Sequence, residues 1–202
     1  MSSNGIYFYT GSMNSSKTSL LVTAAYNYRE RGLTPLVIKP KIDNREDDPT
    51  VIVSRSGGEC KGCYPLLPDT ESGIDTEQFN ELVEMHFDAM IIDEVQFLSL
   101  AQIKQLFLLA RKRNAPLICY GLRNSFVGGG FPASDWLMQN AKHITLLKSI
   151  CHCGSTATHN LMVRDGQAYY GEGSGLIEDP IFVGGNETYH AVCFEHFRKG
   201  EF

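Results

Sequence analysis

Residues 6–18 read Ile6-Tyr-Phe-Tyr-Thr10-Gly11-Ser-Met-Asn-Ser-Ser16-Lys17-Thr18, and this stretch is the strongest indicator of the architecture. The first five residues are β-branched or aromatic, a composition that predicts a buried strand. From residue 17 to residue 31 apolar side chains recur at helical spacing, namely Leu20, Leu21, Ala24, Ala25 and Tyr28. Gly32 can end this helix, and residues 35–39 again read as a strand. Strand, loop, helix and strand in this order predict a βαβ unit.

The polar turn between the first strand and the helix predicts a phosphate-binding loop. Its pattern fits G-x-x-x-x-G-K-[ST], except that Ser16 stands where glycine is usual. In such a loop backbone N–H groups surround a β-phosphate, and the following helix adds its positive end. Lys17 can bridge two phosphates and the Thr18 hydroxyl can reach Mg²⁺. If residue 16 needs a positive φ, serine costs about 1 kcal/mol relative to glycine. The predicted nucleotide-binding residues here are Gly11, Ser12, Met13, Asn14, Ser15, Ser16, Lys17 and Thr18.

The remaining chain predicts an α/β fold with a small appendage. We expect strands at residues 89–92, 117–120 and 143–150, and helices at 75–86, 99–113 and 133–141. Ser99 and Gln102 predict a capping box at the start of the second of these helices. Residues 41–73 predict long loops or a flexible hairpin with a short strand at 51–53. After Ile150 short strands, glycines and cysteine or histidine pairs replace the βα rhythm, and Asp165-Gly166 predicts a hairpin. We therefore expect a P-loop nucleotide-binding domain at 1–150, with helices on a parallel sheet, and a small zinc-binding domain at 151–202.

A second motif, Met90-Ile-Ile-Asp93-Glu94, is an apolar strand that ends in two carboxylates. Ligands of open α/β sheets bind at the carboxyl ends of the strands. One carboxylate can hold Mg²⁺ while the other acts as a base. An acidic pair that only caps a turn would look the same in isolation. After a phosphate loop in the same chain, the catalytic interpretation is favoured.

Composition and charge argue against two classes of protein, those that cross a membrane and those that bind a nucleic-acid backbone. The chain has 202 residues, is 43% hydrophobic and carries a formal charge of −5. No apolar run approaches the ~20 residues that cross a bilayer, and the N-terminus lacks a signal-peptide core, so we expect a cytoplasmic protein with no membrane partner. A binder of nucleic-acid backbone usually shows a basic face. The scattered basic residues favour small phosphate compounds over nucleic acid.

Six cysteines raise the question of metal binding. Cys151 and Cys153 with Cys193 and His196 form two close pairs of soft ligands, which suits a tetrahedral structural Zn²⁺. The C-x-C spacing is tighter than the common C-x-x-C, His152 is a rival ligand, and free buried cysteines are the alternative. All four metal positions would be filled, so the ion would be structural. Cys60 and Cys63 form a separate C-x-x-C pair, which we expect to be reduced and without a catalytic role.

The order of these motifs closely resembles the thymidine kinase family of the cytosolic type. The resemblance rests on the phosphate loop, Asp93-Glu94-Val-Gln96-Phe97, Gly121-Leu122-x-x-x-Phe126, the cysteine pair and Val183-Gly184-Gly185-x-x-x-Tyr189-x-x-x-Cys193. It spans nearly the whole chain, and the combination is more specific than any single motif. The family's similar cysteine pairs strengthen the zinc prediction.

By that resemblance Glu94 is the general base that takes the proton of the nucleoside 5′-hydroxyl, and Lys17 assists the transfer. Asp43, Arg45, Asp93 and Gln96 match residues of the nucleotide and Mg²⁺ region. The residues that match the nucleoside site are Phe97, Leu122, Phe126, Tyr189 and, less securely, Met13 and Phe131, together with a loop over the base that includes Ile181, Phe182, Val183 and Gly184. From composition alone, core packing explains Phe97, Phe126 and Phe131 equally well. The resemblance also implies a homo-oligomer, either a tetramer or a dimer.

The sequence thus predicts transfer of the γ-phosphate of ATP to the 5′-hydroxyl of thymidine or deoxyuridine, with Mg²⁺ and a structural Zn²⁺. The alternative is a P-loop ATPase whose zinc-ribbon tail binds single-stranded nucleic acid or a protein partner. The acidic chain, which lacks interleaved basic and aromatic residues, argues against that alternative. The dependence of ATP consumption on added nucleoside or on added DNA separates the two.

Overall fold

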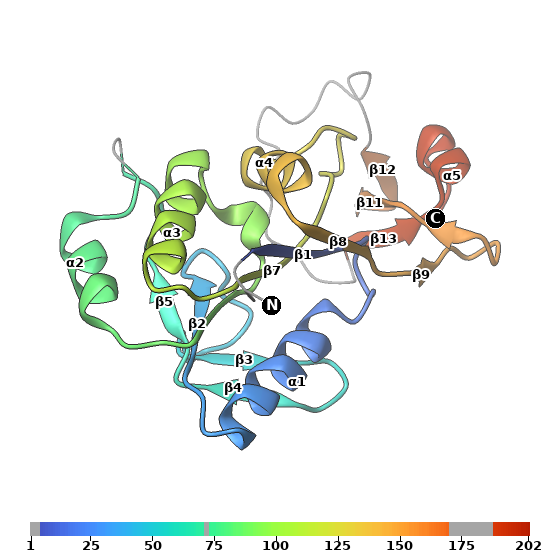
Figure 1. The fold of residues 1–202 in the computed structure, drawn as a ribbon. Helices are drawn as coiled ribbons and strands as arrows, with labels where there is room; N and C mark the ends of the chain where they lie inside the picture. The colour runs from blue at the N-terminus through green and yellow to red at the C-terminus, as the bar shows by residue number, and fades with distance from the viewer. Residues whose placement is uncertain (1–4, 71–72, 170–187) are drawn as a thin grey trace.

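The computed structural model describes residues 5–70, 73–169 and 188–202, and its centre is a six-stranded parallel sheet (Figure 1). The strand order is β5-β2-β6-β7-β1-β8. The bounds are β1 (Ile6–Thr10), β2 (Pro35–Pro40), β5 (Tyr64–Leu66), β6 (Ala89–Ile92), β7 (Leu117–Gly121) and β8 (His143–Leu146). All pairings in this sheet are parallel, so the carboxyl ends of β1 and β6 lie at one edge with β7 between them. The predicted α/β fold is confirmed.

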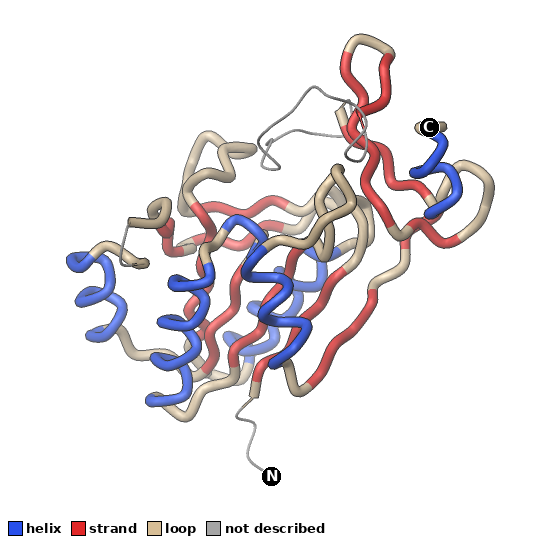
Figure 2. The backbone as a smooth tube through the Cα atoms, turned by 90° about the horizontal axis from the view of Figure 1, so that it is seen from above, coloured by secondary structure: helices blue, strands red, loops and turns tan. Residues whose placement is uncertain are grey.

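Helices cover both faces of this sheet (Figures 1 and 2). On one face α1 (Lys17–Glu30) buries Leu21 and Ala25 against Val37, Ile91 and Ile118. The opposite face packs against α2 (Thr76–Glu84), α3 (Leu100–Lys112) and α4 (Pro132–Asn140). Because successive strand residues point to opposite faces, both cores draw on the same strands, which explains why these strands are apolar throughout.

The helix starts follow from local sequence. Asp75 caps α2, since its carboxylate accepts hydrogen bonds from the backbone N–H groups of Glu77 and Gln78. Ser99 and Gln102 form the predicted capping box at the start of α3. One detail of the expected α1 stripe is wrong, because Leu20 is 39% exposed while its neighbour Leu21 is fully buried.

Of the two alternatives expected for residues 41–73, long loops or a hairpin, the structure has the hairpin, and it adds an edge strand that was not expected. The segment forms an antiparallel hairpin of β3 (Val51–Val53) and β4 (Glu59–Lys61), and then β5 extends the parallel sheet beside β2. The β5 sequence Tyr-Pro-Leu carries little strand signal, and proline is tolerated there because β5 is an edge strand. The Gln78 side chain donates to the carbonyl of Pro65 and accepts from the N–H of Leu67, which fixes this edge.

The single last strand expected at residues 143–150 is wrong. β8 ends at Leu146, and after Leu147 donates to the carbonyl of Thr10 the chain leaves the sheet. It then forms β9 (Ser149–Ile150), which pairs with β10 (Thr156–Ala157) in a separate antiparallel ladder. The continuous β-propensity of this segment hid the break.

The C-terminal part contains a second, three-stranded antiparallel sheet. β11 (His159–Arg164) pairs with β12 (Gln167–Tyr169) and β13 (Tyr189–Val192), and α5 (Phe194–Lys199) packs on β11. Asp165 (φ 52°) and Gly166 (φ 72°) form the predicted hairpin turn. Leu161, Val192 and Phe197 are the centre of a small separate core. None of the described helices is long and apolar enough to cross a membrane.

Candidate active site and metal centre

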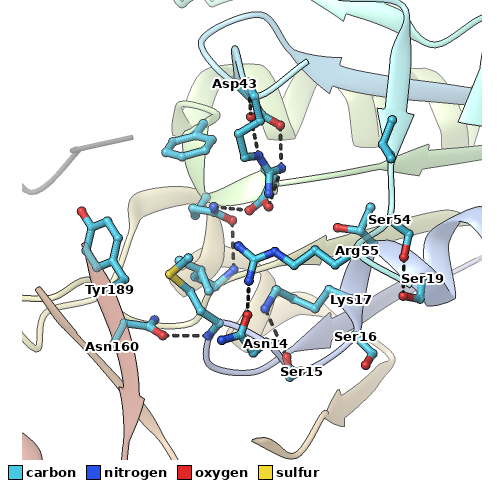
Figure 3. Close-up of a pocket in the computed structure, with 18 of the residues that line it drawn as sticks. Asn14, Ser15, Ser16, Lys17, Ser19, Asp43, Ser54, Arg55, Asn160 and Tyr189 are labelled. Atoms are coloured by element: carbon cyan, nitrogen blue, oxygen red, sulfur yellow. Dashed lines mark hydrogen bonds and ion pairs between the residues drawn. The ribbon is translucent and has the colours of Figure 1, made fainter. Parts of the chain in front are cut away.

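A cavity of about 760 Å³ opens at the carboxyl edge of the parallel sheet. This volume is in the range typical of small-molecule sites. Its walls come from the phosphate loop, the β3–β4 hairpin, the chain after β6 and β7, and the second sheet. Figure 3 shows Ser19 and Ser54 at one end and Asn160 and Tyr189 at the other. The cavity therefore joins a polar end to an aromatic end.

Two residues of the predicted phosphate loop adopt a backbone conformation that favours glycine. Asn14 (φ 61°) and Ser16 (φ 60°) both adopt the left-handed conformation, so Ser16 carries the strain that glycine would avoid. A Cβ atom at Gly11 would lie 2.5 Å from the carbonyl oxygen of Leu147, so glycine is required there by close approach of two chain segments.

Lys17 is buried against its own loop. Its Nζ donates hydrogen bonds to the carbonyl of Ser12 (2.7 Å) and to Ser15 Oγ (3.1 Å). Burial lowers the pKa of Lys17 from 10.5 to about 8, although the negative charges of Glu94 and Asp93 act in the opposite direction. The ammonium group is thus held at the loop that would surround a phosphate, in surroundings that lack sufficient counter-charge.

Glu94 is fixed by partners from two other segments. It directly follows β6, adopts φ 44° and precedes the short helix η1 (Val95–Phe97). Its Oε1 pairs with Arg45 at 2.8 Å, and its Oε2 accepts from Gln96 Nε2 at 2.6 Å. Arg45 also donates twice to Asp43, at 2.6 and 2.7 Å. The hydrogen bond to Asp43 and the charge of Glu94 raise the pKa of Arg45 against the opposing effect of burial.

This network reaches the end of β7. Gln96 Oε1 accepts the N–H of Leu122 at 2.9 Å, so the amide that orients Glu94 is itself oriented by the backbone. Gly121 allows this contact, because a Cβ there would lie 2.5 Å from Gln96 Oε1. The four residues predicted around the nucleotide, Asp43, Arg45, Asp93 and Gln96, are thereby brought close to Glu94.

Asp93 is almost completely buried, and its Oδ2 has no hydrogen-bond partner among the described residues. Burial, and then the charge of Glu94, raise the pKa of Asp93 to about 8. An unpartnered carboxylate oxygen is a group that a hard cation satisfies. The donor chemistry of Asp93 and Thr18 therefore fits Mg²⁺.

The aromatic end of the cavity collects the residues matched to the nucleoside site. The cavity is lined by Met13, Phe97, Leu122, Phe126, Phe131 and Tyr189. The rings of Phe126 and Tyr189 lie 6.1 Å apart at an angle of 51°. Such faces suit a planar base. Ile181, Phe182, Val183 and Gly184, predicted to cover the base, lie outside the described residues.

Sequence reasoning missed several lining residues, among them some from the β3–β4 hairpin and one from the second sheet. From the β3–β4 hairpin, Arg55 donates to Asn14 Oδ1, while Ser54 Oγ lies 2.6 Å from Ser19 Oγ. From the second sheet comes Asn160. The hairpin residues carried a signal in the Ser-Arg-Ser run at 54–56, but Asn160 lies in an ordinary strand pattern that gives no hint of a site.

The predicted metal ligands converge. The ligand atoms of Cys151, Cys153, Cys193 and His196 all lie within 4.8 Å of one another. Sγ atoms of Cys153 and Cys193 are 4.0 Å apart, and His196 Nδ1 lies 3.1 Å from Cys193 Sγ. Tetrahedral zinc with Zn–S bonds near 2.3 Å places sulfur ligands about 3.8 Å apart. His196 Nε2 faces Glu201 at 3.4 Å, a contact that would leave Nδ1 for the metal.

The second cysteine pair is part of the core. Cys60 and Cys63 are 1% and 3% exposed and pack under α1 as free thiols. Cys63 Sγ donates to the carbonyl of Cys60 at 3.3 Å, and Arg29 approaches Cys60 Sγ at 3.5 Å. These contacts show that Cys60 and Cys63 pack at the end of the β3–β4 hairpin, although the composition of this segment suggests a polar loop.

Comparison with known proteins agrees with this geometry. Residues 4–197 match the family model described as thymidine kinase. A thymidine kinase of Shewanella oneidensis is 39% identical over 195 residues, which is 96% of each chain. One from Legionella pneumophila is 36% identical over 197 residues, 97% of this chain and 90% of that protein. One from Vibrio parahaemolyticus is 34% identical over 195 residues, 96% of each chain.

Proposed function

Since this chain belongs to the thymidine kinase family, we propose that its cavity transfers the γ-phosphate of ATP to the 5′-hydroxyl of thymidine. The observation that carries the mechanism is the position of Glu94, whose carboxylate is held by two partners in the cavity that also contains Lys17. A base and a phosphate-binding lysine in one cavity are what phosphoryl transfer to an alcohol requires.

The polar end binds the phosphates in this proposal. Backbone N–H groups of residues 11–18 surround the β-phosphate, and Lys17 leaves its loop carbonyl to offset charge on the transferred group. Bound Mg²⁺, held by Thr18 and Asp93, would neutralise charge on the phosphate oxygens. Arg45, already beside Glu94, supplies a second positive charge close to the reacting atoms.

The aromatic end binds the nucleoside. Phe126 and Tyr189 offer ring faces to the pyrimidine, and Phe97, Leu122 and Phe131 exclude water from it. This orientation directs the 5′-hydroxyl toward the polar end. There Glu94 accepts the hydroxyl proton as the hydroxyl oxygen bonds to the γ-phosphorus, while the bond from that phosphorus to the β,γ-bridging oxygen breaks and ADP leaves. Deoxyuridine differs from thymidine by one methyl group, so it remains a second acceptor. Closure by residues 181–184 rests on the family resemblance alone.

Glu94→Gln tests the assignment. The amide keeps the size of the side chain and cannot accept the proton, so we expect kcat to fall about 10²- to 10⁴-fold. The melting temperature and the affinity for a non-hydrolysable ATP analogue should change little. The control is Glu84→Gln, an exposed change at the end of α2. Turnover near that of the unmodified protein in Glu94→Gln would remove Glu94 from its role.

The competing ATPase function is not favoured, because the family relationship covers nearly the whole chain. A coupled assay with ATP, Mg²⁺ and a panel of deoxynucleosides addresses it directly, since DNA-dependent turnover without a nucleotide product would support it. On the resemblance we also propose a cytoplasmic homo-oligomer, a tetramer or dimer, that divides into units at 1–150 and 151–202. Light scattering measures the oligomeric state.

A further inference from the structure

Asn160 is a buried amide of which only one half is used. It lies in β11, is 2% exposed, and lines the cavity beside Tyr189 (Figure 3). Its Oδ1 accepts the backbone N–H of Met13 at 2.7 Å. Its Nδ2 has no partner in the part of the chain that the structure describes. A buried donor without a partner loses the hydrogen bonds it makes in water, so the cavity contains a donor that gains from a ligand.

The orientation of this amide is fixed by chemistry. The backbone N–H of Met13 can only donate, so the atom facing it must be the carbonyl oxygen of Asn160. The NH₂ group therefore points elsewhere. Asn124, the other buried asparagine of the cavity, differs because its Nδ2 donates to the carbonyl of Thr158 at 3.3 Å. Of these two amides, Asn160 is the one with an available donor.

The position of Asn160 identifies what it can bind. Met13 and Tyr189, its neighbours in the cavity wall, belong with Phe126 to the apolar cluster at the aromatic end. Figure 3 shows the head groups of Lys17 and Arg55 between Asn160 and the serines of the opposite end, with Arg55 bonded to Asn14. At the aromatic end a pyrimidine presents exocyclic carbonyl oxygens, which are strong acceptors. We propose that Asn160 reads the base: its Nδ2 donates a hydrogen bond to an exocyclic carbonyl oxygen of the bound pyrimidine.

This inference rests on the proposed function and adds a side-chain contact that no sequence motif indicates. Asn160 would then have two roles, because its Oδ1 also accepts the N–H of Met13 in the phosphate loop. Ser12 Oγ donates to the carbonyl of Ala157 beside it, at 3.3 Å. The base and the phosphate loop would thus be held by two successive strands of the C-terminal part, β10 with Ala157 and β11 with Asn160.

The test compares thymidine with 4-thiothymidine and 2-thiothymidine, in which sulfur, a weaker acceptor, replaces one carbonyl oxygen. Asn160→Asp keeps the acceptor for Met13 and removes the donor. For the unmodified protein we expect one of the two thio substitutions to lower kcat/KM about 5- to 15-fold, the value of one hydrogen bond. In Asn160→Asp the same substitution should change kcat/KM less than twofold.

Asn124→Asp is the matched control. Asn124 Nδ2 already donates to the carbonyl of Thr158, so the full effect of the thio substitution on kcat/KM should persist in this variant. Asn160→Leu repeats the measurement without introducing a charge, and covers the case in which the aspartate variant does not fold. An undiminished thio effect in both Asn160 variants would overturn the proposal. The proposal would also be overturned if the Asn160 variants changed the response to loss of the sugar 3′-hydroxyl, measured with 3′-deoxythymidine, and left the response to the thio substitutions unchanged. No nucleoside-dependent ATP consumption by the unmodified protein would instead refute the proposed function itself.

Discussion

Raising the pH should weaken nucleotide binding through one residue, Lys17. Burial lowers its pKa from 10.5 to about 8, so the ammonium form is present below pH 8 and is lost above it. A bound phosphate restores the charged form, which means that binding above pH 8 must first recover a proton. At pH 9, one unit above this pKa, the affinity should be about tenfold lower than at pH 7, or about 1.4 kcal/mol. With an ordinary lysine pKa the loss at pH 9 would be negligible.

Isothermal titration calorimetry with ADP, without Mg²⁺, measures this effect. Titrations at pH 9 in buffers of different ionisation enthalpy should reveal uptake of about 0.9 proton per ADP bound. Lys17→Arg keeps its charge and, combined with Asp93→Asn, should show a flat profile. Because the pKa of Asp93 is also raised to about 8, its ionisation would add repulsion over the same pH range, so the series is repeated in Asp93→Asn. An affinity that is independent of pH from 7 to 9 in Asp93→Asn would refute the reasoning.

Two further predictions concern metal and loop strain. Metal analysis should find about one zinc per chain. Cys153→Ser or chelation should destabilise the C-terminal sheet, because its small apolar core depends on the ion. An unchanged melting temperature after complete metal removal would contradict this. Ser16→Gly should raise the free energy of unfolding by about 0.5–1 kcal/mol. The substitution relieves the left-handed backbone of a serine, although glycine also makes the unfolded chain more flexible. A urea titration that shows destabilisation would contradict strain at this position.

Much of the fold followed from periodic patterns. The apolar strand at 89–92 and the capping box at Ser99 each determine an element locally, and both were predicted. β5 was not predicted, because Tyr-Pro-Leu becomes a strand only when β2 offers an edge and Gln78 secures it. The break between β8 and β9 depends on long-range pairing as well, which a local pattern cannot report.

The residues of the site also differ in whether a local sequence pattern indicates them. Lys17 and Glu94 stand in motifs whose spacing reflects their chemistry, so sequence indicated them. Arg45 could be placed near them only by family resemblance, and the structure adds its ion pair with Glu94. Arg55 and Asn160 reach the cavity from segments that are distant in sequence. The Ser-Arg-Ser run at 54–56 is a local sign of Arg55, whereas nothing local indicates Asn160. Residues of this kind become visible only after tertiary packing has brought their segments together.

The sharing of Arg45 between Asp43 and Glu94 has a consequence for how the base is placed. Both oxygens of the Glu94 carboxylate have partners, Oε1 in Arg45 and Oε2 in Gln96 Nε2. The carboxylate is therefore held in one orientation before any ligand enters the cavity. A substrate that docks against it meets a side chain that is already ordered, so the loss of its rotational freedom occurs during folding and is not repeated at each turnover.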